Sequence, residues 1–139
     1  MTKVLIHHET IATSITGAVA HRVRYHSRDV AGRPTEATGL VIAPDSPGEG
    51  RRVVSWAHGT TGMGDAACPS AQPDPARELT LYFAPGSTTQ IDYGIPGLQR
   101  FVDDGWVVVA TDYQGLGTPG MHQYTVNRTN AIDAVRIVH

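Results

Sequence analysis

The sequence has little cysteine, no long hydrophobic run and no marked excess of one charge. Its single cysteine, Cys68, excludes an internal disulfide and a multi-cysteine zinc site. At the N-terminus only three consecutive apolar residues precede His7 and His8, too few for a signal-peptide core or a membrane anchor, so we expect the chain as written to be cytoplasmic. A net charge of -2 argues against nucleic acid or an anionic membrane as a partner and favours a neutral small molecule.

Histidine is a common metal ligand, and the chain contains seven histidines. They are scattered along the sequence and show neither a His-Glu-x-x-His pattern nor a paired cysteine spacing. We therefore expect no metal site and no cofactor, and we expect His7 and His8 to lie exposed near the terminus.

Two segments in the first third of the chain have the patterns of β-strands. Residues 19–26 alternate, with Val19, Val23 and Tyr25 on one face and basic side chains on the other, which is typical of a half-buried strand. The segment DVAGRPTEA then predicts a turn, and a second strand is expected over 39–42. Together these segments predict an antiparallel hairpin.

Two later segments have the pattern of strands that are covered on both faces. RVVSWAHG carries Val53 and Val54 without clean alternation, and WVVVATD, at 106–112, repeats this pattern more strongly. Between them, IPGLQRFVDDG has apolar residues at helical spacing, a proline at its entry and a glycine as its C-terminal stop. Strand, helix and strand in this order predict a parallel pair joined by a crossover, and hence an α/β fold.

The last segment of the chain, NRTNAIDAVRIVH, predicts a helix, because four small or branched apolar residues share one helical stripe: Ala131, Ala134, Val135 and Val138. In an α/β sheet such a helix leads into another strand. We therefore expect the chain to be interrupted at His139.

The longest stretch without a clear element runs from 63 to 96 and is rich in Pro, Ser, Thr and Gly. Long loops of this kind in compact domains are often functional. We interpret the stretch as an irregular surface loop, with a short helix or a flap as the alternative for its apolar residues: Leu79, Leu81, Tyr82, Phe83 and Ile91.

His58 and Gly59 follow the first buried strand, at the end of a sheet where a free backbone N–H can point into a crevice. Gly59 permits a sharp turn, which allows the amide of Thr60 or Thr61 to face that crevice. Backbone donors in this position stabilise the oxyanion that forms during acyl transfer. The His-Gly pattern taken alone fits a tight turn with a capped histidine equally well.

Further segments occur together with this turn in a fixed order. They are YHSRDVAGRPTEATGLVIAP, VVSWAHGTTG, CPS and VVVATDYQGLGTPG, followed by an alanine-rich helix. In this combination the chain resembles the secretory-lipase group of α/β hydrolases, the fungal lipase A-like family, from about Ile6 to the end. The resemblance implies hydrolysis of carboxylic esters, often acylglycerols, through a Ser-Asp-His triad without a cofactor, and a secreted parent protein. The implied fold is an α/β-hydrolase sheet with an antiparallel N-terminal hairpin followed by parallel strands with crossover helices.

The residues that the resemblance assigns to the site fall in two loops. The first loop holds the oxyanion donor and its support: Thr60 or Thr61 as the donor, with His58, Gly59 and Gly62. The second loop lies beside the site and is shaped by four residues: Asp112, Tyr113, Gly115 and Gly117. Asp112 is interpreted as a strand-end hydrogen-bond anchor rather than a catalytic carboxylate, and His122 as a candidate substrate contact.

The nucleophile that such a site requires is missing from the sequence. A nucleophile elbow needs Gly-x-Ser-x-Gly, and no serine has glycines two positions before and after it: Ser14, Ser27, Ser46, Ser55, Ser70 and Ser87. We therefore expect residues 1–139 to be the N-terminal portion of one α/β-hydrolase domain, an incomplete sheet without the elbow or the later strands. Such a chain should be nearly inert, and its unpaired hydrophobic edge should promote self-association.

Other readings of the same residues have different consequences. GLGTPG, at 115–120, fits a dinucleotide-binding fingerprint, but Pro119 delays the following helix and Asp133 lies inside that helix instead of ending a second strand. The chain is alternatively a non-catalytic truncated product, or a complementing half that pairs with a separate chain carrying the serine, the acid and the histidine.

Overall fold

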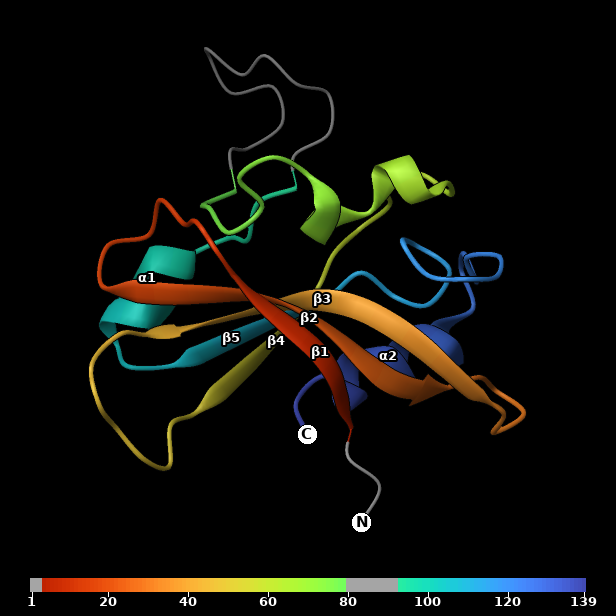
Figure 1. Ribbon diagram of the computed structural model, residues 1–139, viewed down its shortest axis with the longest axis horizontal. Coiled ribbons are helices and arrows are strands. Elements are labelled where there is room, and N and C mark those ends of the chain that lie inside the picture. The colour runs from red at the N-terminus through yellow and green to blue at the C-terminus, as the bar shows by residue number, and fades with distance from the viewer. Residues whose placement is uncertain (1–3, 80–92) are drawn as a thin grey trace.

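A computed structural model describes residues 4–79 and 93–139 of the chain. Within these residues the strands form one mixed sheet with the order β1-β2-β3-β5-β4, and helices pack on both of its faces (Figure 1). The strands are β1 (Leu5–Ile11), β2 (Ala18–Arg28), β3 (Pro34–Pro44), β4 (Val53–Ala57) and β5 (Val107–Thr111). The helices are α1 (Leu98–Asp103) and α2 (Asn127–Arg136), with two short 3-10 turns, η1 (Asp65–Ala67) and η2 (Pro69–Ala71).

The predicted N-terminal hairpin is confirmed as β2 and β3, which pair antiparallel over their whole length. Both strands are longer than the alternating residues alone indicated, because pairing extends to the edges of the turn. In that turn the Asp29 carboxylate accepts hydrogen bonds from the amides of Ala31 and Arg33, each at 2.9 Å. Gly32 adopts a φ of +79°, which a residue without a Cβ does at little cost.

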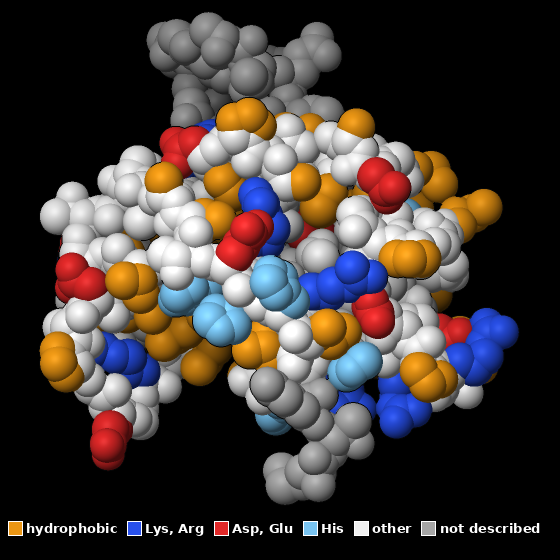
Figure 2. Space-filling view, viewed as in Figure 1, with side chains coloured by type: hydrophobic (Ala, Val, Ile, Leu, Met, Phe, Trp, Pro, Cys, Tyr) orange, Lys and Arg blue, Asp and Glu red, His pale blue; other side chains and the backbone are white. Residues whose placement is uncertain are grey.

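The sequence did not predict β1, which lies at one edge of the sheet and pairs antiparallel with β2. Most of its side chains are exposed, so it carries little of the apolar pattern by which strands are recognised. His7 and His8 are exposed, as expected. The strand is fixed by its ladder and by an ion pair between Glu9 and Arg22 at 2.7 Å. Imidazole side chains gather on the viewed face that β1 crosses (Figure 2).

The parallel pair joined by a helix is confirmed as β4, α1 and β5. Helix α1 buries Leu98 and Val102 in a cluster with Leu40, Ile42 and Val108 on one face of the sheet. Strand β5 is buried, as predicted. The prediction that β4 is also covered on both faces is wrong, since β5 lies between β3 and β4 and leaves β4 at the edge of the sheet.

Helix α2 packs on the opposite face of the sheet, where Ile137, just past its end, joins a second cluster with Val23 and Val109. The helix is present as predicted, but the predicted apolar stripe is not its buried face. Val135 on that stripe is 60% exposed, whereas Asp133 is fully buried. The orientation follows from the Asp133 carboxylate, which accepts hydrogen bonds from sheet and loop residues and so turns the valines outward.

The stretch that follows β4 is irregular over 72–79 apart from bridges that tie it to the rest of the domain. Ala76 pairs with Thr13, and Glu78 pairs with Ile95, near the start of α1. The alternative of a short helix or flap concerned residues most of which lie outside the described part of the chain: Leu81, Tyr82, Phe83 and Ile91. Among the described residues, no helix has the length and apolar character needed to cross a membrane.

Candidate functional site

The two loops that sequence analysis singled out meet at the carboxyl ends of β4 and β5. The strands are parallel neighbours, with Ala57 opposite Thr111, so the loops that follow them start side by side. The Tyr113 hydroxyl donates a hydrogen bond to the backbone carbonyl of His58 at 3.1 Å. The rings of these two residues also pack together, with centroids 4.6 Å apart. The loop after β5 therefore fixes the start of the loop after β4.

The loop after β4 presents backbone amides that have no hydrogen-bond partner within the described residues. This holds for the N–H groups of Gly59, Thr60 and Thr61. Gly59 and Thr60 are exposed, whereas Thr61 is buried and its hydroxyl oxygen has no partner among the described residues either. Unpaired donors at a strand end are the groups that can bind an anionic oxygen.

The end of this loop is held close to η1 by Gly62, which has a φ of +124°. A Cβ at this position would come within 2.9 Å of the Ala67 side chain, closer than real contacts allow. Glycine is therefore required here by both conformation and space. No comparable restriction applies at Gly59, where an added Cβ would meet open space.

His58 is half-buried between the two loops. Its Nδ1 lies 2.6 Å from the carbonyl oxygen of Gly59, and its Nε2 is buried with no partner among the described residues. Burial lowers the pKa of His58, because the charged imidazolium loses solvation there, and this outweighs the stabilising Gly59 carbonyl. The imidazole is therefore neutral near pH 7, and its Nε2 is a buried atom without a hydrogen-bond partner among the described residues.

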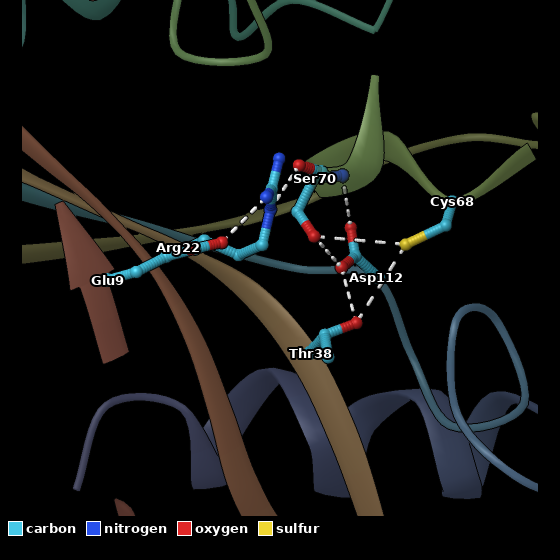
Figure 3. Close-up of polar contacts among 6 residues, drawn as sticks. All are labelled: Glu9, Arg22, Thr38, Cys68, Ser70 and Asp112. Carbon is cyan, nitrogen blue, oxygen red and sulfur yellow. Dashed lines mark hydrogen bonds and ion pairs between the residues drawn. The ribbon is translucent and has the colours of Figure 1, made fainter. Parts of the chain in front are cut away.

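Asp112 ties the second loop to the 3-10 turn η2 and to β3 (Figure 3). One carboxylate oxygen accepts a hydrogen bond from the Ser70 amide at 2.8 Å. The other accepts from the Ser70 hydroxyl at 2.5 Å and from the Thr38 hydroxyl at 2.7 Å. Both oxygens are thus engaged and the residue is only 1% exposed, so Asp112 joins the start of the second loop to η2 and β3.

Cys68 lies beside this network, with its sulfur 3.8 Å from the hydroxyl oxygens of both Ser70 and Thr38 (Figure 3). Burial, together with the nearby Asp112 carboxylate, raises the pKa of the thiol to about 11. The side chain is 2% exposed. Cys68 is thus a protonated, packed residue and not a nucleophile.

Gly115 and Gly117 both have positive φ, +78° and +70°, and both permit close approach of another segment. A Cβ on Gly115 would lie 2.4 Å from the His122 amide nitrogen, and one on Gly117 would lie 2.9 Å from the Cys68 sulfur. The Gly117 amide also donates to the Asp65 carboxylate at 3.0 Å. The second loop is therefore locked against η1 and η2.

Tyr113 and His122 form the inner wall of the site. Tyr113 is 6% exposed and has a φ of +67°, an uncommon conformation for a residue with a side chain. His122 stacks against it with centroids 6.1 Å apart and places its Nδ1 3.2 Å from the Gln114 carbonyl oxygen. His122 is itself buried, so in this structure it supports Tyr113 and does not face an open surface.

Several residues that organise the site were not found from the sequence. Ser70, Thr38 and Asp65 hold the second loop although they lie far from it in sequence. Ser70 and Thr38 fall within two segments that carry the family resemblance, CPS and YHSRDVAGRPTEATGLVIAP, but no role was assigned to either residue. Asp133 is a further case, because its carboxylate accepts hydrogen bonds from the Ser27 hydroxyl and from the Gln114 amide, the latter at 2.9 Å. The one available signal was an aspartate within the predicted helix, next to the apolar residues of its stripe.

No hydrogen-bonded serine–histidine pair of the kind that serine hydrolases use is formed among the described residues. None of their serine hydroxyls forms a hydrogen bond to a histidine ring, and the Ser70 hydroxyl is bound to Asp112. No group of three or more metal-ligating side chains occurs among them either. The site as described offers backbone donors and their supports, without a nucleophile.

No known protein family and no curated protein matches this sequence. Among solved structures, the rice cell wall degrading esterase LipA from Xanthomonas oryzae superposes with a TM-score of 0.66 at 20% identity, over 97% of this chain and 36% of that one. Candida antarctica lipase A in its closed state superposes with a TM-score of 0.68 at 12% identity, over 96% of this chain and 30% of that one. This chain therefore spans about a third of the length of these structures, and the likeness confirms an α/β-hydrolase fold with an antiparallel entry hairpin and a parallel pair.

Proposed function

We propose that this chain is the N-terminal portion of a carboxylic ester hydrolase of the secretory-lipase type, and that it supplies the oxyanion-binding loop of the active site. The observation that carries the proposal is the row of unpaired backbone amides at Thr60 and Thr61, held at the end of β4 by the hydrogen bond from Tyr113 to the His58 carbonyl. The esterase and lipase activities in the names of the two similar structures agree with it.

In the proposed reaction a serine from outside this chain attacks the carbonyl carbon of an ester. The carbonyl oxygen becomes an oxyanion, and the amide of Thr60 or Thr61 donates a hydrogen bond to it. The oxyanion then collapses and the ester C–O bond breaks. The alkoxide leaves as an alcohol with the proton that a histidine from outside this chain took from the serine, and water then releases the acid from the acyl-serine. Asp112, Gly115 and Gly117 hold the neighbouring loop and take no part in proton transfer.

The experiment that tests the proposal begins with the coding DNA beyond codon 139, read in all three frames for a strand followed by Gly-x-Ser-x-Gly. A protein extended through such an elbow should hydrolyse p-nitrophenyl butyrate and be labelled by a serine-directed fluorophosphonate. Absence of any hydrolase-like sequence downstream would overturn the proposal and leave a non-catalytic product.

Variants of the extended protein then assign the oxyanion donor. Thr60→Pro and Thr61→Pro each remove one backbone N–H, and the variant that removes the donor should lower kcat by about 100- to 1,000-fold with little change in KM. Thr60→Ser and Thr61→Ser keep the N–H and serve as matched controls. If both proline variants fold and retain the full rate, the loop is not the oxyanion site.

The edge of the sheet at β4 indicates where further strands could be added. Strand β4 pairs only with β5 among the described residues, and Val53 on it is 43% exposed. The apolar stripe of α2 is exposed as well. We propose that polypeptide carrying the remaining strands, in the same chain or a separate one, pairs with β4, and that the chain self-associates in its absence.

A further inference from the structure

A cavity of about 290 Å³ lies on the face of the sheet that carries α2, where the helix ends and no longer covers the strands. Its floor is formed by Val23, Tyr25 and Val41, and Ile137 forms one wall. None of these residues belongs to the loops at the ends of β4 and β5. The cavity is therefore separate from the proposed oxyanion site.

The apolar lining of this cavity has a structural origin. Along β2, every second side chain faces α2, which places His21, Val23 and Tyr25 in one row. The Tyr25 hydroxyl is bound to the Thr111 hydroxyl at 2.7 Å and to the Asp133 carbonyl at 3.1 Å. Since its polar atom is engaged inside the domain, Tyr25 offers only its ring to the cavity.

The polar groups around the cavity are basic. His8, His21, Arg136 and His139 line it, with the imidazole centroids of His8 and His21 5.7 Å apart, and no Asp or Glu side chain does. Arg136 forms no ion pair within the described residues. Of the acids close in sequence, Glu9 pairs with Arg22, and Asp133 is buried against Ser27 and Gln114.

Three backbone carbonyl groups at the end of α2 are already engaged in hydrogen bonds. The carbonyls of Asp133, Val135 and Arg136 each accept a backbone hydrogen bond at 3.2 Å from the residues that follow. The Asp29 carboxylate, which lines the neighbouring cavity together with Arg136, is held by Arg33 at 2.6 Å. The positive charge of Arg136 is therefore available to a ligand.

We propose that this cavity binds a straight-chain monocarboxylate of medium length. The hydrocarbon chain lies against Val23, Val41 and Ile137, and the carboxylate lies at Arg136 and His21. Binding sites for small molecules are mostly apolar with a few polar groups that fix orientation, and this volume is at the low end of their usual range of about 300–1,000 Å³. A guanidinium suits a carboxylate, because it can donate two parallel hydrogen bonds.

The test is a titration of the isotope-labelled chain with octanoate below its micelle concentration, followed by NMR. Resonances of Val23, Val41 and Ile137 should shift in a saturable way, and those of residues 58–62 should not. Octan-1-ol and octylamine have the same chain without the negative charge and should bind more weakly, and acetate should not bind. Equal binding of octanoate and octylamine, or shifts confined to other residues, would overturn the proposal.

Two variants test separately the contribution of the Arg136 charge and the contribution of the apolar lining to ligand binding. Arg136→Gln should weaken octanoate binding about fivefold and leave octan-1-ol unchanged, whereas Arg128→Gln on the same helix, outside this cavity, should change neither. Val41→Phe fills the cavity and should weaken both ligands. An equal loss in Arg136→Gln and Arg128→Gln would show a general charge effect and refute the site. Because the readout is binding by this chain alone, it does not depend on the proposed hydrolase activity.

Discussion

The side chain of Ile137 lies directly over Gly39, in the middle of β3. A Cβ added to Gly39 would stand 2.7 Å from the Cδ1 of Ile137 and 2.3 Å from the Ala110 carbonyl oxygen. Because the backbone of Ala110 is held in the sheet and cannot move away, the contact between Ile137 and Gly39 sets how closely the end of α2 approaches the sheet.

Gly39→Ala should therefore lower the free energy of unfolding by about 1–3 kcal/mol, the usual cost of forcing an extra methyl group into a packed interior. Urea denaturation followed by circular dichroism measures this. Gly64→Ala is the matched control, since an added Cβ there meets nothing within 4 Å and the change should cost less than about 0.5 kcal/mol. Equal stability of both variants would contradict the packing described for Ile137.

Tyr113→Phe removes the hydroxyl that holds the His58 carbonyl and leaves the ring stack in place. The expected loss of stability is about 0.5–1.5 kcal/mol, with shifts of the Gly59 and Thr60 amide resonances, because the carbonyl is released. Tyr124→Phe, at a residue 44% exposed, should change neither quantity. An unaltered Gly59 amide in Tyr113→Phe would show that the loop is held by other contacts.

Asp133 gives stability a pH dependence with a definite sign. Burial raises the pKa of this carboxyl, against the hydrogen bonds from Ser27 and Gln114 that lower it, so the folded state holds the proton more tightly than the unfolded state. The stability that the protonated Asp133 carboxyl contributes is fully present below the pKa of the unfolded state, about 4. It is lost as the pH rises through the pKa of the folded state.

Asp133→Asn cannot ionise and has one acceptor oxygen in place of two, so a mismatch with either the Ser27 hydroxyl or the Gln114 amide costs up to about 1–3 kcal/mol. The stability advantage of the unmodified chain over this variant should therefore be largest at acid pH and narrow as the pH rises above about 4. Chemical denaturation of both proteins at a series of pH values tests this. An advantage that grows with pH would mean that the carboxylate is stabilised by its partners instead.

Charge substitutions can distinguish self-association through the edge of β4 from non-specific aggregation. The unmodified chain should sediment as a concentration-dependent mixture, and Val53→Lys should shift it toward monomer, because a lysine on an edge strand disfavours strand pairing. Val30→Lys is the control, as Val30 is similarly exposed, at 45%, but lies in the β2–β3 turn. A monodisperse monomer in the unmodified chain would count against the edge as an interface.

Cys68 should be unreactive in the folded chain. Its thiol has a pKa of about 11 and is 2% exposed, so a disulfide reagent at pH 8 should modify it slowly until urea unfolds the protein, and then completely. Rapid modification of the folded chain would indicate that the Asp112 network opens readily.

The part of the fold that could be predicted is the part encoded by neighbouring residues. Alternation predicted the β2–β3 hairpin, and two valine-rich runs separated by a helical pattern predicted the parallel pair. Strand β1 was missed because its exposed polar side chains carry no such pattern. The orientation of α2 was not predictable, since it depends on Asp133 meeting Ser27, 106 residues away in the sequence.

In the candidate site, too, the features encoded by neighbouring residues could be predicted and the contacts between distant residues could not. The loops after β4 and β5 could be placed side by side because parallel strands end at the same edge of a sheet. The bond between Asp112 and Ser70 spans 42 residues. Asp112 could be predicted as an anchor, but the CPS segment that contains Ser70 does not by itself reveal which residue it contacts.

The sheet order also sets a sequence of events during synthesis. Strand β4 is made before β5, yet it joins the sheet only through β5, which is inserted between β3 and β4. A nascent chain that has emerged to residue 100 can pair β1, β2 and β3 but does not yet contain the strand with which β4 pairs. The loop from His58 to Gly62 can therefore gain its support from the Tyr113 hydroxyl only after β5 and Tyr113 have been synthesised.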